Sequence, residues 1–146
     1  MDGKIIMNFI SETNQISTKL FSGLQDDSYA VPDIKWITEE FTPRFKKFLF
    51  DNNLRESEEN SNDCEDFSDN AISVGRTLYF NDSQKIKEHA LSIGFFDYLS
   101  NIESHRIVMI VAHENKNLKL VFYEPLTQEI IPLDLKNIGF IWEWRL

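Results

Sequence analysis

Cys64 is the single cysteine of the chain and lies among acidic residues. Asp63 before it is a favourable N-cap residue, and Asp66 stands near the third position of the helix that this segment predicts. The free N–H groups and the macrodipole at such a helix end favour a thiolate over a thiol. The neighbouring carboxylates act in the opposite direction, because negative charges raise the pKa of a thiol. Cys64 is therefore a candidate nucleophile, although a lone cysteine on a buried helix face is more often an inert small apolar residue.

His105 and Glu124 are the candidates for the base and for the group that orients it, which a thiolate nucleophile needs. A hairpin turn at Asn115 and Lys116 would place Glu124 diagonal to His105 on the same face of two antiparallel strands. Diagonal neighbours on such a face lie within side-chain reach. The sequence therefore predicts a trio of nucleophile, base and orienting carboxylate in the order Cys64, His105, Glu124.

A strongly acidic segment surrounds the cysteine. Residues 51–70 hold eight acidic residues against Arg55 alone, a net charge of −7. Such a segment is either a solvated loop or a site for a hard cation. In the second case Asp63, Glu65 and Asp66 are the candidate ligands of calcium or manganese, and the ion would reverse the local field at the thiol. We expect no organic cofactor.

The length and composition limit the class of protein. A chain of 146 residues with 42% apolar residues predicts one compact domain, spanning residues 1–146, with residues 1–30 as a candidate N-terminal extension. The net charge of −9 argues against nucleic acid as a partner, and no apolar run could span a bilayer. No secretory signal is recognisable, so we expect a cytoplasmic protein, or a phage-borne protein or one exported without a signal.

The elements that must position these residues follow from the apolar spacing. Helical spacing predicts a helix or two within residues 1–24, a helix over residues 33–50 that starts or kinks at Pro43, and a helix with a buried stripe formed by Phe67, Ala71, Val74 and Leu78. Apolar and β-branched runs predict strands over residues 105–113, 118–123, 130–133 and 138–144. Helices followed by antiparallel strands indicate an α+β fold, with a Cys-bearing helix packed on a C-terminal antiparallel sheet.

Three parts of the sequence together resemble a known family: the DCEDF motif at residues 63–67, His105, and the EPLT motif at residues 124–127. They resemble the papain-like C-terminal domain of the fairy-ring mushroom agglutinin and related phage and bacterial proteins. In that family the nucleophile lies in an Asp-Cys-Asp-Asp-Phe motif, a strand histidine is the base, and the Glu of Glu-Pro-Gln-Thr orients it. The mushroom domain is a calcium-dependent cysteine protease.

The resemblance implies a papain-like cysteine peptidase or amidase that cleaves a peptide or other amide bond of a peptide or protein substrate. Cys64 would be the nucleophile, His105 the base and Glu124 the orienting residue. The sequence departs from the family where Glu65 replaces Asp and Leu126 replaces Gln. Those changes affect the expected cation site and the surroundings of the expected triad.

Other interpretations of the same residues stay open. The protein could be a non-enzymatic acidic binding protein, such as an inhibitor or immunity protein that docks on a basic partner surface, or a catalytically silent papain-like structural protein. His113 shares the strand face of His105 and is a second candidate base. A zinc site of Cys64, His105 and His113 is a weak alternative, because the chain lacks the CxxC and HExxH spacings.

Overall fold

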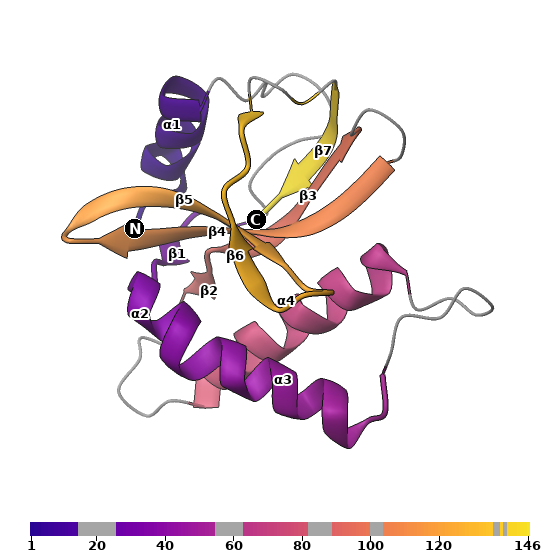
Figure 1. Ribbon diagram of the computed structural model, residues 1–146. Helices are drawn as coiled ribbons and strands as arrows, with labels where there is room; N and C mark the ends of the chain where they lie inside the picture. Colours follow the sequence, from indigo (N-terminus) through magenta and orange to yellow (C-terminus); the bar gives the residue numbers. More distant parts are fainter. Residues whose placement is uncertain (15–25, 55–62, 82–88, 100–103, 136–137, 139) are drawn as a thin grey trace.

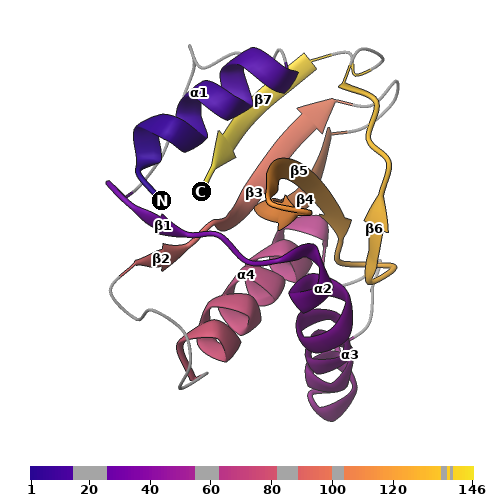
Figure 2. The same cartoon turned by 90° about the vertical axis from the view of Figure 1, so that its left-hand side faces the viewer.

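The fold is α+β, with a five-stranded antiparallel sheet between two layers of helices (Figures 1 and 2). The computed structural model describes residues 1–14, 26–54, 63–81, 89–99, 104–135, 138 and 140–146. Its helical segments are α1 (Gly3–Asn14), α2 (Ile34–Trp36), the π-helical turn η1 (Ile37–Phe41), α3 (Thr42–Asp51) and α4 (Cys64–Asn81). Its strands are β1 (Tyr29–Ala30), β2 (Ala90–Leu91), β3 (Ile93–Leu99), β4 (Ser104–Glu114), β5 (Asn117–Glu124), β6 (Glu129–Ile131) and β7 (Phe140–Arg145).

The predicted hairpin forms the centre of the sheet. The strand order is β6-β5-β4-β3-β7, and β4 pairs with β5 in the predicted register, with His113 opposite Leu118. Asn115 and Lys116 adopt positive φ angles of 51° and 69°, which match the right-handed twist of the paired strands in a two-residue turn. Pairing with β5 begins at Val108 and leaves the first residues of β4 beyond the end of β5.

The helical stretch before the acidic segment contains the irregularity that Pro43 predicts. The N–H and the hydroxyl of Thr42 both donate to the carbonyl of Ile37, which is the wide spacing of a π-helical turn. Pro43 follows at once and has no N–H to donate. Regular α-helix then continues through α3.

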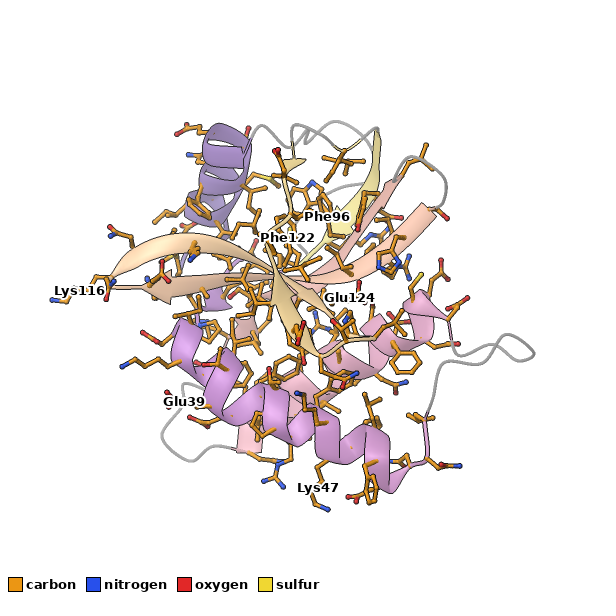
Figure 3. The ribbon with its side chains drawn as sticks, in the orientation of Figure 1. Glu39, Lys47, Phe96, Lys116, Phe122 and Glu124 are labelled. Carbon is orange, nitrogen blue, oxygen red and sulfur yellow. The ribbon has the colours of Figure 1, made fainter. Side chains whose placement is uncertain are left out.

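Two apolar cores lie on opposite faces of the sheet. On one face, α2, α3 and α4 pack against alternate residues of β4, with Val108 and Ile110 fully buried. On the other face, α1 packs against the intervening residues, including Ile107 and Met109. Figure 3 shows Phe96 and Phe122 on the α1 side. Both faces of the sheet are therefore covered.

The N-terminal segment belongs to the second core. Ile6, Ile10 and Tyr29 are all completely buried there, although residues 1–30 are a candidate extension in the sequence. Of the helix or two predicted within residues 1–24, α1 is present, and residues 15–25 lie outside the described part of the chain. Tyr29 also donates its hydroxyl to the carbonyl of Leu146 at 3.1 Å, which ties the start of the chain to its end.

Three strands do not follow from the sequence pattern. β3 lies inside the sheet, between β4 and the edge strand β7, and the short strands β1 and β2 form a separate parallel pair. Gly94 within β3 permits a close approach to β7, because a Cβ there would lie 1.7 Å from the carbonyl oxygen of Arg145. Among the described residues, no helix combines the length and the apolar character required to cross a membrane.

Candidate functional site

The helix α4 begins at Cys64, as the acidic segment predicts. The carboxylate of Asp63 accepts hydrogen bonds from the N–H groups of Glu65 at 2.9 Å and Asp66 at 3.3 Å, which is the N-cap arrangement. Phe67 and Ala71 form the buried stripe with Val74 and Leu78 partly buried beside them, so the predicted spacing is confirmed. Cys64 stands at the end of this helix and is partly exposed.

Backbone groups of Arg106 attach the first two turns of α4 to strand β4. The N–H of Arg106 donates to the sulfur of Cys64 at 3.4 Å, and the hydroxyl of Ser68 donates to the carbonyl of Arg106 at 3.2 Å. Arg106 lies before the point at which β5 pairs with β4, so β5 does not use these groups. The early end of β5 thus leaves room for the helix to bond to the strand.

His105 and Glu124 meet as the hairpin register predicts. The Nε2 atom of His105 lies 2.6 Å from the Oε2 atom of Glu124, and the N–H of Leu126 donates to Oε1 of the same carboxylate at 3.1 Å. Figure 3 shows Glu124 near the N-terminal half of α4. The ring of Tyr98 packs edge-on against His105 with 5.7 Å between the ring centres. The orientation of the imidazole is therefore set by a carboxylate and an aromatic ring.

A cleft of about 280 Å³ brings together Cys64 and His105, which are two members of the predicted trio. Glu124 contacts the cleft through His105 and is 9% exposed. Side chains from α4, β3, β4 and β7 complete the walls: Glu65, Asp97, Ser104, Arg106 and Glu143. Most of these residues are polar or charged, so the cleft suits a polar or charged ligand.

Arg106 and Asp97 form a partly buried ion pair in this cleft that the sequence did not predict. The guanidinium of Arg106 donates hydrogen bonds to both carboxylate oxygens of Asp97, at 2.6 and 2.7 Å. The Cζ atom of Arg106 lies 4.3 Å from the centre of the Phe95 ring. Asp97 raises the pKa of Arg106 above its ordinary value. Alternation along β4 predicts that Arg106 and His105 point to opposite faces, yet both line the cleft because it lies where β4 extends beyond β5.

The surroundings of Cys64 favour the neutral thiol. Burial raises the pKa of the thiol above its ordinary value of 9.0, and the nearby carboxylates of Asp63 and Glu65 raise it further. The N–H of Arg106 lowers the pKa, but burial is the largest effect. The environment of Cys64 therefore favours the thiol over the thiolate, although a helix N-terminus by itself favours the thiolate.

The predicted cation site has no formed coordination shell in the described part of the chain. No three His, Cys, Asp or Glu side chains come close enough there to hold a metal ion. Asp63 serves as the N-cap, whereas Glu65 and Asp66 are exposed. Residues 55–62 of the acidic segment lie outside the described part. Calcium or manganese binding by Asp63, Glu65 and Asp66 therefore stays a prediction.

His113, the second candidate base, lies at the far end of β4. It pairs with Leu118 next to the turn, and its backbone N–H donates to the carbonyl of Pro32 at 2.7 Å. It is not among the residues that line the cleft with Cys64. The structure therefore brings His105, and not His113, into the same cleft as the cysteine.

The comparisons with known proteins identify the fold. No family model matches the chain, and no curated protein matches it. A solved structure of a PSL1a–E64 complex matches with a TM-score of 0.75 and 15% identity, over 100% of this chain and 50% of that chain. Polyporus squamosus lectin bound to the human-type influenza-binding epitope Neu5Aca2-6Galb1-4GlcNAc matches with a TM-score of 0.73 and 16% identity, over 100% of this chain and 49% of that chain. The chain thus spans about half the length of these structures, and identities this low show the fold alone.

These findings contradict the expectation of a hydrolase. The matching solved structures include a lectin, which is a carbohydrate-binding protein, and the chain has a single cysteine. The prediction of a cysteine hydrolase or thiol protease that cleaves a peptide or amide bond is therefore wrong as the leading interpretation. The alternative of a non-enzymatic binding protein agrees better with the comparisons. The individual assignments to Cys64, His105 and Glu124 stay predictions.

Proposed function

We propose that this protein is a non-catalytic binding protein that docks the N-terminal end of α4, with the adjoining cleft, on a basic surface of a partner protein. One observation carries the proposal. Four exposed carboxylates gather at the N-terminal end of α4: Asp63, which precedes the helix, and Glu65, Asp66 and Asp69 in its first two turns. They lie next to the cleft that contains Cys64, where Arg106 is the single lysine or arginine among the described lining residues.

The charges of the cleft leave this surface acidic. Arg106 is already paired with Asp97, and its nearest approach to Glu65 is 4.0 Å. Glu143, which also lines the cleft, pairs with Arg145 at 2.6 Å. The side chain of Glu65 is 63% exposed and so is available to a partner. The basic residues of the cleft do not neutralise all of these carboxylates, so a cationic surface of a partner could pair with them.

The state of Cys64 supports binding over catalysis. A nucleophile of the papain type must supply a thiolate, whereas burial and the carboxylates of Asp63 and Glu65 raise the pKa of this thiol. The same carboxylates that disfavour the thiolate favour a cationic partner. One set of charges thus accounts for both properties.

The relation to agglutinins is part of the proposal. A domain like the papain-like half of the fairy-ring mushroom agglutinin would match about half of a lectin chain, which is the share found in both solved structures. We propose that this chain retains such a papain-like fold and uses it for binding. Its partner, in this account, is recognised by positive charge.

A titration with a basic probe tests the proposal. Fluorescein-labelled decalysine is the probe, fluorescence anisotropy is the measurement, and the same peptide with acetylated lysines is the neutral control. We expect binding that weakens steeply as salt is added, because exposed charge pairs are screened. The triple variant Glu65→Gln, Asp66→Asn, Asp69→Asn should bind about tenfold more weakly, since each exposed pair contributes roughly 0.2–1 kcal/mol.

A matched variant separates a local site from a general effect of charge. Glu12, Glu39 and Glu40 are exposed acidic residues outside α4 and outside the cleft. Changing all three to Gln alters the net charge by the same amount as the α4 variant, so we expect less than a twofold change in affinity. Equal weakening by both variants, or no binding of decalysine to the wild-type protein, would overturn the proposal.

A further inference from the structure

A second cleft adjoins the first turn of α4. It has a volume of about 480 Å³, and five of its seven lining residues have apolar side chains: Leu49, Phe50, Leu54, Phe67 and Leu126. The polar residues Asn53 and Gln128 complete the lining. No lysine, arginine, aspartate or glutamate is among the described residues that line it. The two clefts share this region of α4, because Cys64 lines the first and Phe67 lines the second.

Phe50 is the most exposed large apolar side chain of the described residues. It is 86% exposed, whereas Leu49 beside it is 7% exposed. An aromatic ring that remains in water at the edge of an apolar cleft is typical of a protein contact site. The exposure of Phe50 therefore indicates that this cleft is used in binding.

The end of α3 holds this wall in place. Asn53 adopts a left-handed conformation with φ of 51°, and the N–H of Leu54 donates back to the carbonyl of Leu49 at 3.0 Å. This pattern is a common way to end a helix, and it brings the residue after the turn against the last turn of the helix. The position of Phe50 on that last turn is therefore fixed by hydrogen bonds of the backbone.

We infer that this apolar cleft receives a large aliphatic side chain of the same basic partner. The inference rests on the proposed function, because the positive charge of the partner is argued from the acidic end of α4. Asp66 and Phe67 are adjacent, and so the acidic surface and the apolar cleft begin within one helical turn. The partner therefore presents a leucine-like residue flanked by lysine or arginine.

Two peptides test this inference. They are acetylated and amidated pentapeptides of sequence Lys-Lys-Leu-Lys-Lys and Lys-Lys-Gly-Lys-Lys, titrated into the protein by calorimetry. We expect the leucine peptide to bind the wild-type protein about tenfold more tightly, because a buried leucine side chain supplies apolar contact area that glycine lacks. In the variant Phe50→Ser the preference should fall to about twofold or less, because one apolar wall is lost.

The control variant is Ile5→Ser, which removes an apolar side chain that is 53% exposed on α1, on the other side of the sheet (Figures 1 and 2). It should keep the full preference for leucine. Thermal unfolding checks that both variants are folded. We expect both to fold, because the side chains of Phe50 and Ile5 are exposed. A preference that persists in Phe50→Ser, or is absent from the wild-type protein, would overturn the inference.

The acidic variant of α4 distinguishes a failure of this inference from a failure of the proposed function. If both are right, that variant weakens both peptides by the same factor and keeps the preference for leucine. Loss of the preference with retained dependence on the α4 carboxylates overturns the inference alone. Affinities that do not depend on those carboxylates overturn the proposed function, and the inference with it.

Discussion

The arrangement of Cys64, His105 and Glu124 is compatible with two functions, catalysis and binding. Glu124 holds His105 at 2.6 Å, and Cys64 lines the same cleft as His105. The pKa of the Cys64 thiol distinguishes between these two functions, because catalysis requires the thiolate. Burial and adjacent carboxylates raise the pKa of Cys64 above its ordinary value and so disfavour the thiolate, which is the reactive form.

Alkylation of Cys64 with iodoacetamide tests this statement directly. Because the pKa is raised, the rate should increase with pH along a curve whose midpoint lies above 9.0. The variant Glu65→Gln should move the midpoint to lower pH, because it removes one of the charges that raise the pKa. Mass spectrometry measures the rate.

His105→Ala is the critical control for that experiment. It should leave the rate of alkylation at neutral pH unchanged, because a protonated thiol without base assistance does not depend on the imidazole. Rapid alkylation at neutral pH that disappears in His105→Ala would contradict a non-catalytic role.

The sequence predicted the functional cleft only in part. The contact between His105 and Glu124 was predictable because both residues lie on a hairpin whose register is set by apolar runs and a short turn. The ion pair of Arg106 and Asp97 was not, because Asp97 lies on β3 and only the pairing of β3 with β4 brings the two together. Contacts across a hairpin are local in sequence, whereas this pairing depends on tertiary structure.

At the scale of elements, the N-cap of α4 determines where the cleft forms. Asp63→Ala should destabilise the protein by about 0.5–2 kcal/mol, because two helix N–H groups lose their acceptor. Asp63→Asn should cost less, since an asparagine oxygen can accept the same bonds. Urea unfolding measures both. Equal effects of the two substitutions would show that the charge of Asp63, and not its capping, is what stabilises the helix.

Gly94 tests the close packing of β3 against β7. Gly94→Ala should destabilise the fold by roughly 1–3 kcal/mol or more, because a Cβ would collide with the backbone of Arg145, which cannot move without separating the strands. Gly75→Ala is the matched control in α4. Its Cβ would meet the tip of the Ile93 side chain at 2.8 Å and the ring of Phe41 at 3.3 Å. These are side-chain atoms, which shift more readily than the backbone of Arg145, and alanine favours the helix.

A comparable destabilisation by the two alanine substitutions, measured by urea unfolding, would contradict this account of the β3–β7 contact.

Gly94 also explains why β3 was not predicted from the sequence. Gly94 and Asp97 interrupt the apolar pattern of the strand, whereas the uninterrupted apolar run of β4 predicted that strand well. The helix α4 was predictable for a similar reason, since its buried stripe follows helical spacing without a break.

At the scale of the whole molecule, the described helices pack on both faces of the sheet, and the two clefts adjoin the N-terminal end of α4. The cores with α1 on one side and with α2, α3 and α4 on the other use most of the apolar side chains. The net charge of −9 then falls on the periphery, and the end of α4 carries four of its exposed carboxylates. In the proposed function, this distribution of charge attracts a basic partner at a distance and orients it towards that end.

Mapping the bound probe on the protein tests the central claim most directly. In a titration of ¹⁵N-labelled protein with decalysine, followed by NMR, we predict that the shifted amide signals cluster at residues 63–69 and at residues 104–106, which form the end of α4 and the adjoining part of β4. The peptide should remain intact throughout. Shifts confined to α1 or to the turn at Asn115, or the appearance of cleaved peptide in the sample, would contradict the account.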